Sequence, residues 1–365
     1  KGWRPISLLN VDFKIISSAI ANRLKLVMNI IISPSQSAYI QGRFIGENTR
    51  LVYDVIEHLK GSKRTGSIIA ADFETAFESI AWKFLRKALE KYNFGPKFRN
   101  ILETIYFNQN NFSRIMMDGF LGEKVAMERG IRQGDPSSGY LFNLAVEPLA
   151  CQLVHAQTFK GITISPTIEV KLSQYADDLI VFTDQTLESV SGVISECETF
   201  STVSGLSLNV EKTKCLLIGE RNEEVQHNIA ALRIQTVDEM KILGITFNSN
   251  NNNLTQINMD NVIQSIKVII TQWKRRYLTL VGKIAIIRSL LLSKLAHLFL
   301  TLPSPPHTAI KELNSVLYAF LWNSNVDKVK RSELVQKYEN DGLHMVDIIA
   351  YIRGMKTSWL QRLRR

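Results

Sequence analysis

The 365 residues include 44 Lys and Arg against 34 Asp and Glu, a formal net charge of +10, and 45% of them are hydrophobic. This composition excludes a disordered or disulfide-stapled chain and indicates a globular protein with two or three subdomains. The cysteines Cys151, Cys197 and Cys215 are far apart, which argues against a zinc site. We expect all three to be buried small hydrophobes in a reducing compartment.

The basic excess is confined to the C-terminal part. Residues 1–253 carry 27 Lys and Arg against 27 Asp and Glu, residues 254–300 carry 7 against 1, and residues 326–365 carry 9 against 5. This asymmetry is typical of a protein that binds a polyanion through salt-sensitive contacts, although a merely solvated basic face is also common. Because Lys or Arg interrupts the longest apolar runs, we expect a soluble protein without a membrane span.

The first elements are helical. Apolar residues recur at helical spacing over 12–31 and again over 51–59, and residues 36–43 between them predict a loop or strand. Arg4 and Arg43 are either surface charges or guanidinium forks for phosphate.

The segment 67–71 predicts a buried strand, and Asp72 stands at its end. A carboxylate there is well placed as a metal ligand or catalytic group, because the strand fixes its position and the sheet end is open. Helices are predicted over 82–92 and 96–107. Two short strands near 115–117 and 124–127 then flank a hairpin turn.

A second acidic site is predicted at 172–182, which reads as strand, tight turn and strand with Asp177 and Asp178 at the tip. Two adjacent charges in apolar surroundings are costly to desolvate, and a divalent metal offsets that cost; an exposed turn is the alternative. Before it, the Gly-rich loop 130–143 leads into an apolar helix.

The chain from residue 187 onward predicts further helices and strands. A helix over 187–203, a strand over 215–218 and a strand over 242–247 precede the polar connector 248–253. Two long helices follow, broken near Leu278-Thr279, and Pro303-Ser304-Pro305-Pro306 separates them from a last helical region.

Five motifs occur in an order that resembles the palm of a reverse transcriptase. They are the strand ending in Asp72, Arg132-Gln133-Gly134, Tyr175-Ala176-Asp177-Asp178, Asn209-Val210-Glu211-Lys212 and Leu243-Gly244-Ile245. The opening Trp3-Arg4-Pro5-Ile6-Ser7-Leu8-Leu9 and the later Phe320-Leu321-Trp322-Asn323 are similar to the long interspersed element type of non-LTR retrotransposon.

The resemblance implies an α+β right-hand polymerase. Fingers would occupy 1–71, a palm of antiparallel sheet and helices with the remaining fingers elements 72–253, a helical thumb 254–302 and a basic helical region 303–365. The implied activity is addition of dNTPs to a DNA primer 3′-hydroxyl on an RNA template, with an RNA–DNA hybrid as bound product, in the nucleus. The chain starts at Lys1 rather than Met, and we interpret it as a segment of a longer polypeptide that lacks an endonuclease and other domains.

The resemblance also assigns roles to residues. Asp72, Asp177 and Asp178 would hold two Mg²⁺ ions, with Mn²⁺ as an alternative, and Lys212 would donate a proton to the leaving pyrophosphate. Phe77 would exclude a ribose 2′-hydroxyl, although plain core packing is its alternative. The incoming nucleotide would contact Lys1, Arg4, Arg43, Phe77, Gln133, Gly134 and Tyr175. Leu243, Gly244 and Ile245 would grip the primer, and Lys274, Arg275, Arg276, Lys283 and Arg288 would follow the duplex backbone.

Two positions depart from the family pattern, and we expect both to be tolerated. Glu78 stands where Asp is usual, and Ser138-Gly139 replaces Ser-Pro. Three alternatives stay open: a group II intron maturase-like enzyme, a catalytically silent RNA-binding module with the same fold, and a decayed element.

Overall fold

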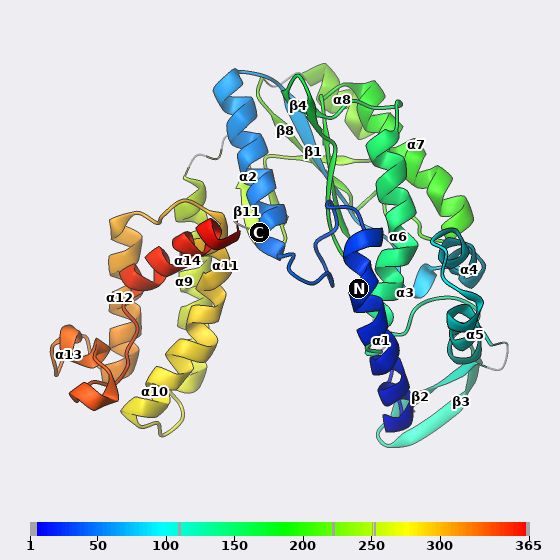
Figure 1. Cartoon of the computed structure of the whole chain (residues 1–365). Helices are drawn as coiled ribbons and strands as arrows, with labels where there is room; N and C mark the ends of the chain where they lie inside the picture. The colour runs from blue at the N-terminus through cyan, green and yellow to red at the C-terminus, as the bar shows by residue number, and fades with distance from the viewer. Residues whose placement is uncertain (1–5, 109–110, 221–222, 250, 252, 363–365) are drawn as a thin grey trace. The chain divides into compact units, whose positions relative to one another are not determined.

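The computed structural model describes residues 6–108, 111–220, 223–249, 251 and 253–362 (Figure 1). The helices are α1 (Val11–Ile31), α2 (Ile45–Ser62), α3 (Ala76–Ser79), α4 (Trp82–Lys91), α5 (Pro96–Ile105), α6 (Ser138–His155), α7 (Leu187–Ser204), α8 (Glu223–Ala231), α9 (Leu254–Trp273), α10 (Leu280–Ile286), α11 (Leu292–Thr301), α12 (His307–Trp322), α13 (Arg331–Val335) and α14 (Ile348–Arg362). The strands are β1 (Gly66–Ala71), β2 (Phe112–Met117), β3 (Phe120–Ala126), β4 (Ile162–Ser165), β5 (Ile168–Val170), β6 (Leu172–Tyr175), β7 (Asp178–Thr183), β8 (Lys214–Ile218), β9 (Gln235–Val237), β10 (Glu239–Ile242) and β11 (Ile245–Asn248).

The chain divides into two compact units. The first runs to residue 240 apart from 52–54, and the second comprises 52–54 and the residues from 241 onward. The four-part division into fingers, palm, thumb and C-terminal region remains a prediction.

A five-stranded sheet in the order β6-β7-β1-β8-β9 is the centre of the first unit. All neighbours are antiparallel except β8 and β9, which are parallel. The register places Ile69 beside Val181 and Cys215, all fully buried, and all three contribute to the main core cluster. Apolar residues on both faces of the inner strands therefore explain why these segments read as continuous hydrophobic runs.

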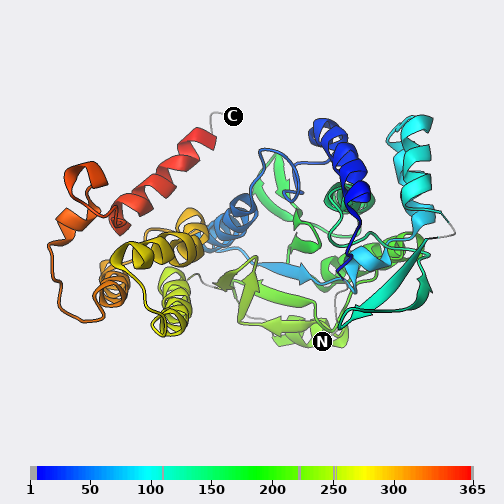
Figure 2. The ribbon, with the colours of Figure 1, turned by 90° about the horizontal axis from the view of Figure 1, so that it is seen from below.

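Helices α6 and α7 pack against each other and against strands β6 and β7 (Figures 1 and 2). Most of α6 is buried, so its apolar residues cover nearly its whole circumference rather than one stripe. Helix α1 packs on α6 and carries the N-terminal part of the chain along it. This arrangement holds the Gly-rich loop before α6 next to the ends of β1 and β7.

Several boundaries differ from the sequence predictions. The strand expected at 242–247 is two strands, β10 and β11, because Leu243 and Gly244 adopt positive φ angles of 46° and 88° and form a hairpin turn. The β2–β3 hairpin is longer than predicted, since only Asp118 and Gly119 form its turn. Elements β4, β5, α8 and β9 were not predicted.

One expectation about burial is wrong, and one helical segment is more continuously apolar than expected. Cys151 is exposed, whereas Cys197 and Cys215 are buried as expected. The continuous helical segment Leu280–Thr301 is apolar and long enough to span a membrane by length and composition, despite its lysines and arginine. Half of its most apolar stretch is buried inside the protein, as in the core helix of a folded domain.

Candidate active site

Two neighbouring strand ends bring the predicted carboxylates together. The last registered pair of β1 and β7 is Ala71 with Leu179. Asp72 comes directly after this pair on one strand and Asp178 directly before it on the antiparallel strand, so both lie at the same edge of the sheet. Asp177 lies in the tight turn between β6 and β7, which begins at Ala176 with φ 53°. The sheet therefore places three carboxylates at one edge, although Asp72 precedes Asp177 and Asp178 by more than 100 residues in the sequence.

The segment after α7 places Lys212 beside Asp72. The backbone N–H of Asn209 donates to the carbonyl of Asp72 (2.7 Å), and the Asn209 side chain accepts from the N–H of Lys212 (3.2 Å). Lys212 Nζ then lies 3.8 Å from Asp72 Oδ2, with both side chains largely exposed. Lys212 is thus at the carboxylate site, as predicted, whereas Lys214 begins β8.

The carboxylates suit a hard divalent cation in kind, since Mg²⁺ prefers oxygen ligands. Within the part of the chain that the structure describes, however, no three His, Cys, Asp or Glu side chains lie close enough to hold one ion together. The expected three-carboxylate cluster is therefore not assembled here, and Lys212 is the cation nearest Asp72.

A cavity of about 510 Å³ opens beside Asp177. It is lined by three of the predicted nucleotide contacts, Phe77, Gln133 and Gly134. Phe77 stacks on Phe142 of α6, with ring centroids 4.2 Å apart and planes 13° apart, and stays half-buried. Phe77 therefore packs on Phe142 and also lines the cavity, and its role at the sugar remains a prediction.

The same cavity contains a tyrosine that the sequence did not single out. Tyr39 has a positive φ of 58° and is 51% exposed. Its ring lies against Gly139, where an added Cβ would come within 2.6 Å of ring atoms. Burial and the nearby charge of Asp177 raise the pKa of Tyr39 above its usual value of 10. Glycine at 139, noted only as a departure from the family, is what makes room for this ring.

A buried polar network fixes the loop that forms one wall of the cavity. Asp135 is 6% exposed and accepts hydrogen bonds from Ser17 of α1, from Tyr106 and from the backbone N–H of Ser137. Burial, followed by the charge of Asp135, raises the pKa of Tyr106, so the phenol stays protonated and donates. A buried carboxylate with several donors is stable only while all remain in place, so the network holds the loop rigid.

Gln133 is held from both sides. Its side-chain amide donates to Glu78 Oε1 (2.7 Å), and its carbonyl accepts from the N–H of Ser7 (2.8 Å). Glu78, the second departure from the family pattern, therefore orients Gln133 toward the cavity. Gly134, with φ 99°, lets the segment at Ser7 approach the loop closely.

Arg43 is not placed as a phosphate ligand. Its guanidinium donates to the carbonyls of Ile32 (2.8 Å), Ser33 and Gln36 (2.6 Å), which follow the end of α1. Burial lowers its pKa, and the charge of Glu147 partly offsets this. The expected role at the triphosphate is thus replaced by a structural one. Lys1 and Arg4 lie outside the described residues, and Tyr175 pairs with Asp178 across the hairpin without lining the cavity.

The expected primer-grip residues lie in the second unit. Leu243 and Gly244 form the β10–β11 turn and Ile245 begins β11, where its side chain is buried. His297 of α11 hydrogen-bonds through Nε2 to the Leu243 carbonyl (2.9 Å). The turn is therefore anchored to α11 by one histidine.

The burial of His297 predicts a pH dependence of stability. Burial lowers the pKa of His297 below 6.5, only partly countered by its hydrogen bond to Leu243. The unfolded chain therefore binds a proton that the folded chain resists, so the free energy of unfolding falls as pH drops below about 6.5. Urea unfolding at pH 7.5 and 5.5 should show this loss, and the His297→Gln variant should show less of it. Equal losses in both proteins would remove His297 as the cause.

The predicted duplex-contacting cations differ in their surroundings. Lys274, Arg275 and Arg276 line a cavity of about 350 Å³ beside the fully exposed Tyr277. Lys283 lines it too but is only 7% exposed, and its Nζ donates to the Leu321 carbonyl (3.0 Å) at the end of α12. Burial and the charges of Lys274 and Lys328 lower its pKa. Lys283 thus caps a backbone carbonyl at the C-terminal end of α12. Arg288 is exposed in a separate π-helical turn, Ile287–Leu291.

Comparison with known proteins assigns the chain to a family. Residues 1–247 match the family model described as reverse transcriptase (RNA-dependent DNA polymerase). The chain is 31% identical over 331 residues to a 149 kDa protein of transposon TX1 from Xenopus laevis, covering 88% of this chain and 24% of that protein. It is 26% identical to the Pol polyprotein of the retrotransposable element R2DM from Drosophila melanogaster, covering 67% and 23%. The chain thus spans about a quarter of the length of these relatives.

A solved structure supports the fold. Telomerase from Candida albicans, determined in complex with a fragment of telomeric RNA, aligns with 91% of this chain and 56% of its own chain. The TM-score is 0.50 at 10% sequence identity, a likeness of fold alone. The predicted α+β right-hand polymerase class is confirmed. The chain belongs to the reverse transcriptase (RNA-dependent DNA polymerase) family, with the affinity to non-LTR retrotransposons that its motifs predict.

Proposed function

We propose that this chain is the polymerase core of a non-LTR retrotransposon protein, which extends a DNA primer on an RNA template. The observation that supports this most directly is the cavity shared by Asp177, Phe77 and Gln133. It unites a carboxylate at the sheet edge, an aromatic wall and a polar loop in a space that suits one nucleotide.

The residues at this site would each have a separate role in nucleotide addition. Asp72, Asp177 and Asp178 would hold the Mg²⁺ ions, which lower the pKa of the primer hydroxyl and neutralise the triphosphate. Lys212, exposed beside Asp72, would give a proton to the leaving pyrophosphate. Phe77 would press against the sugar from its place on Phe142, and Gln133, oriented by Glu78, would contact the nucleotide from the loop.

The substrates and location belong to the same proposal. The curated relatives are proteins of transposable elements, and the telomerase structure contains an RNA fragment. We infer an RNA template, a DNA primer and dNTPs for this chain, binding of the RNA–DNA hybrid, and action in the nucleus. The chain covers only about a quarter of these relatives, which supports a longer polypeptide with further domains.

Primer extension tests the proposal. The chain is incubated with a 5′-labelled DNA primer on an RNA template, all four dNTPs and Mg²⁺ at low salt, and the products are resolved by length. Extension that stops when Mg²⁺ is chelated supports the proposal. Tight duplex binding without extension would instead favour the silent RNA-binding module.

Gly139 offers a test of the cavity. In the Gly139→Val variant the new side chain would collide with the Tyr39 ring, whose atoms lie within 2.6 Å of the Cβ position. We expect the KM for dNTP to rise about tenfold, a change of roughly 1.4 kcal/mol, with a smaller effect on kcat. The double variant with Tyr39→Ala should regain much of the loss, because the colliding ring is gone. Additive losses would mean that Gly139 acts without Tyr39.

The basic cluster near α9 predicts salt-sensitive duplex binding. Replacing Lys274, Arg275 and Arg276 with Ala should weaken binding to an RNA–DNA duplex uniformly across sequences. The slope of log affinity against log salt should become shallower by about 0.9 for each lost phosphate contact. Lys283→Met is the control: it should cost about 1–3 kcal/mol of stability through the lost bond to Leu321 but leave the slope unchanged. A slope that changes only in the control would reverse these assignments.

A further inference from the structure

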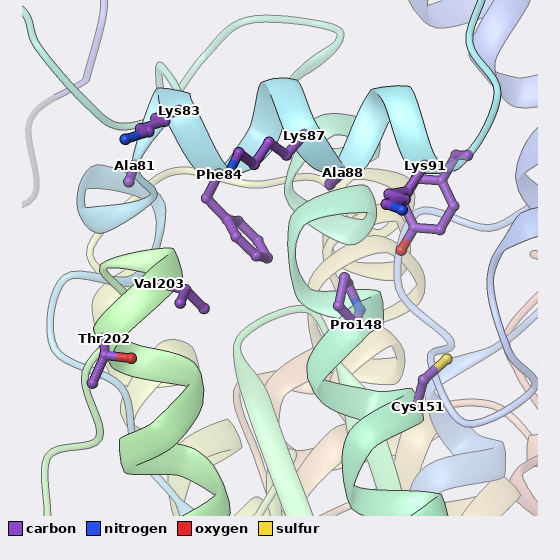
Figure 3. A pocket seen from close by; sticks show the side chains of 11 residues that line it. Ala81, Lys83, Phe84, Lys87, Ala88, Lys91, Pro148, Cys151, Thr202 and Val203 are labelled. Carbon is purple, nitrogen blue, oxygen red and sulfur yellow. The ribbon is translucent and has the colours of Figure 1, made fainter.

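A second large cavity lies away from the carboxylates. It has a volume of about 720 Å³ and is bounded by α4, α6 and α7 (Figure 3). Its apolar floor and far wall come from Phe84 and Ala88 of α4, Pro148 of α6 and Val203 of α7. Val203 is 59% exposed, so this groove presents apolar surface to solvent, and it shares no lining residue with the cavity beside Asp177.

Three lysines form one edge of the groove. Lys83, Lys87 and Lys91 are spaced four residues apart on α4, so each stands about 6 Å further along the helix than the one before. All three are exposed. Figure 3 shows them in a row along α4. None of the residues that line the groove is acidic.

The three lysines differ from the other charged residues of α4. The other charged residues of α4 are paired: Arg86 with Glu103 at 2.6 Å, and Glu90 with Arg99 at 3.3 Å. Across the described ranges, no ion pair joins the three lysines to an acidic side chain. Three like charges in a row repel one another, and an acidic partner would relieve this repulsion.

The floor favours a peptide over a nucleic acid strand. Single strands are held by aromatic faces on which bases stack, but Phe84 here meets Phe200 edge-to-face with centroids 5.3 Å apart. Tyr92 also lines the groove just after α4, but the other apolar lining residues, Ala81, Ala88, Pro148 and Val203, are aliphatic. A trough between three helices is the shape that accepts the apolar face of another helix. A partner helix with acidic residues four apart would repeat the 6 Å spacing of the lysines.

We propose that this groove binds an amphipathic helix of a partner protein. Its apolar residues, at positions i, i+3 or i+4 and i+7, fill the trough over Ala88, Pro148 and Val203. Its Asp or Glu residues along one flank pair with Lys83, Lys87 and Lys91. The site is independent of the carboxylate edge, so a partner can dock while the nucleotide cavity stays open.

Fluorescence anisotropy tests the proposal with a defined probe. The probe is a labelled 18-residue synthetic helix with a leucine face and glutamates four apart along one flank. It should bind the full chain, and the triple variant Lys83→Glu, Lys87→Glu, Lys91→Glu should lose at least tenfold in affinity. Val203→Asp should also weaken binding, because it puts a charge on the apolar wall. The same peptide with Lys in place of Glu should bind at least tenfold more weakly.

Matched controls separate docking from general charge. The triple variant Lys14→Glu, Lys97→Glu, Lys160→Glu makes the same change in net charge at exposed lysines that do not line the groove, and it should bind the probe normally. The probe should also shield the exposed thiol of Cys151, on the groove wall, from alkylation. Both triple variants should retain primer extension, so failure of docking and failure of polymerase activity are read separately.

Three results would overturn the proposal. One is no binding of the probe; another is equal binding to the groove variant and its control. The third is displacement of the probe by single-stranded RNA that itself loses affinity in the groove variant, which would make the lysine row a nucleic acid site.

Discussion

We expect the Asp177→Asn variant to lose primer extension by about a thousandfold or more while keeping its fold. The substitution removes the negative charge that a Mg²⁺ ion needs, and transition-state stabilisation by a bound metal amounts to several kcal/mol. The side chain is only partly buried in the turn after β6, so little packing is lost. Single-turnover extension and the thermal unfolding midpoint, measured on the same preparation, check both parts.

Asp118→Asn provides the matched control for this prediction. Asp118 also occupies a two-residue hairpin turn, but on the exposed β2–β3 hairpin, and there the Asp itself has a positive φ (49°). The same chemical change there should leave extension unaltered. If Asp177→Asn retains activity within tenfold, the carboxylate assignment fails, even if the chain proves to be a polymerase.

The second large effect is expected at Phe77. The Phe77→Val variant should accept ribonucleotides at least tenfold more readily relative to dNTPs, because the ring that limits space at the sugar is shortened. The variant also loses its stack on Phe142, so we expect about 1–3 kcal/mol of destabilisation. The ratio of kcat/KM for dCTP and CTP measures the first effect and urea unfolding the second.

Phe94→Val separates selectivity from stability. Phe94 stacks on Phe98 with centroids 5.0 Å apart, and neither lines the nucleotide cavity. This control should be destabilised to a similar degree without changing the dCTP to CTP ratio. An unchanged ratio in Phe77→Val would return Phe77 to a packing role alone.

The sequence by itself determined the parts of the protein that follow from local pattern. The strand before Asp72, the Asp177-Asp178 turn and the helices α1, α4, α5 and α7 were predicted to within a few residues, because apolar periodicity and turn chemistry act over short distances. The five motifs in order predicted the family, and the family model confirms it.

Only the tertiary structure decided which side chains meet. Arg43 carries the guanidinium group that commonly binds phosphate. In the fold, however, this group donates its hydrogen bonds to backbone carbonyls that follow α1. No local sequence pattern indicates that Tyr39 lies in the cavity, because its position there depends on Gly139, a hundred residues away. The lysine row of α4 is a common surface pattern until Pro148 and Val203 supply an apolar floor beside it. Local spacing sets which face of an element a residue occupies, but the packing of distant elements decides what lies opposite that face.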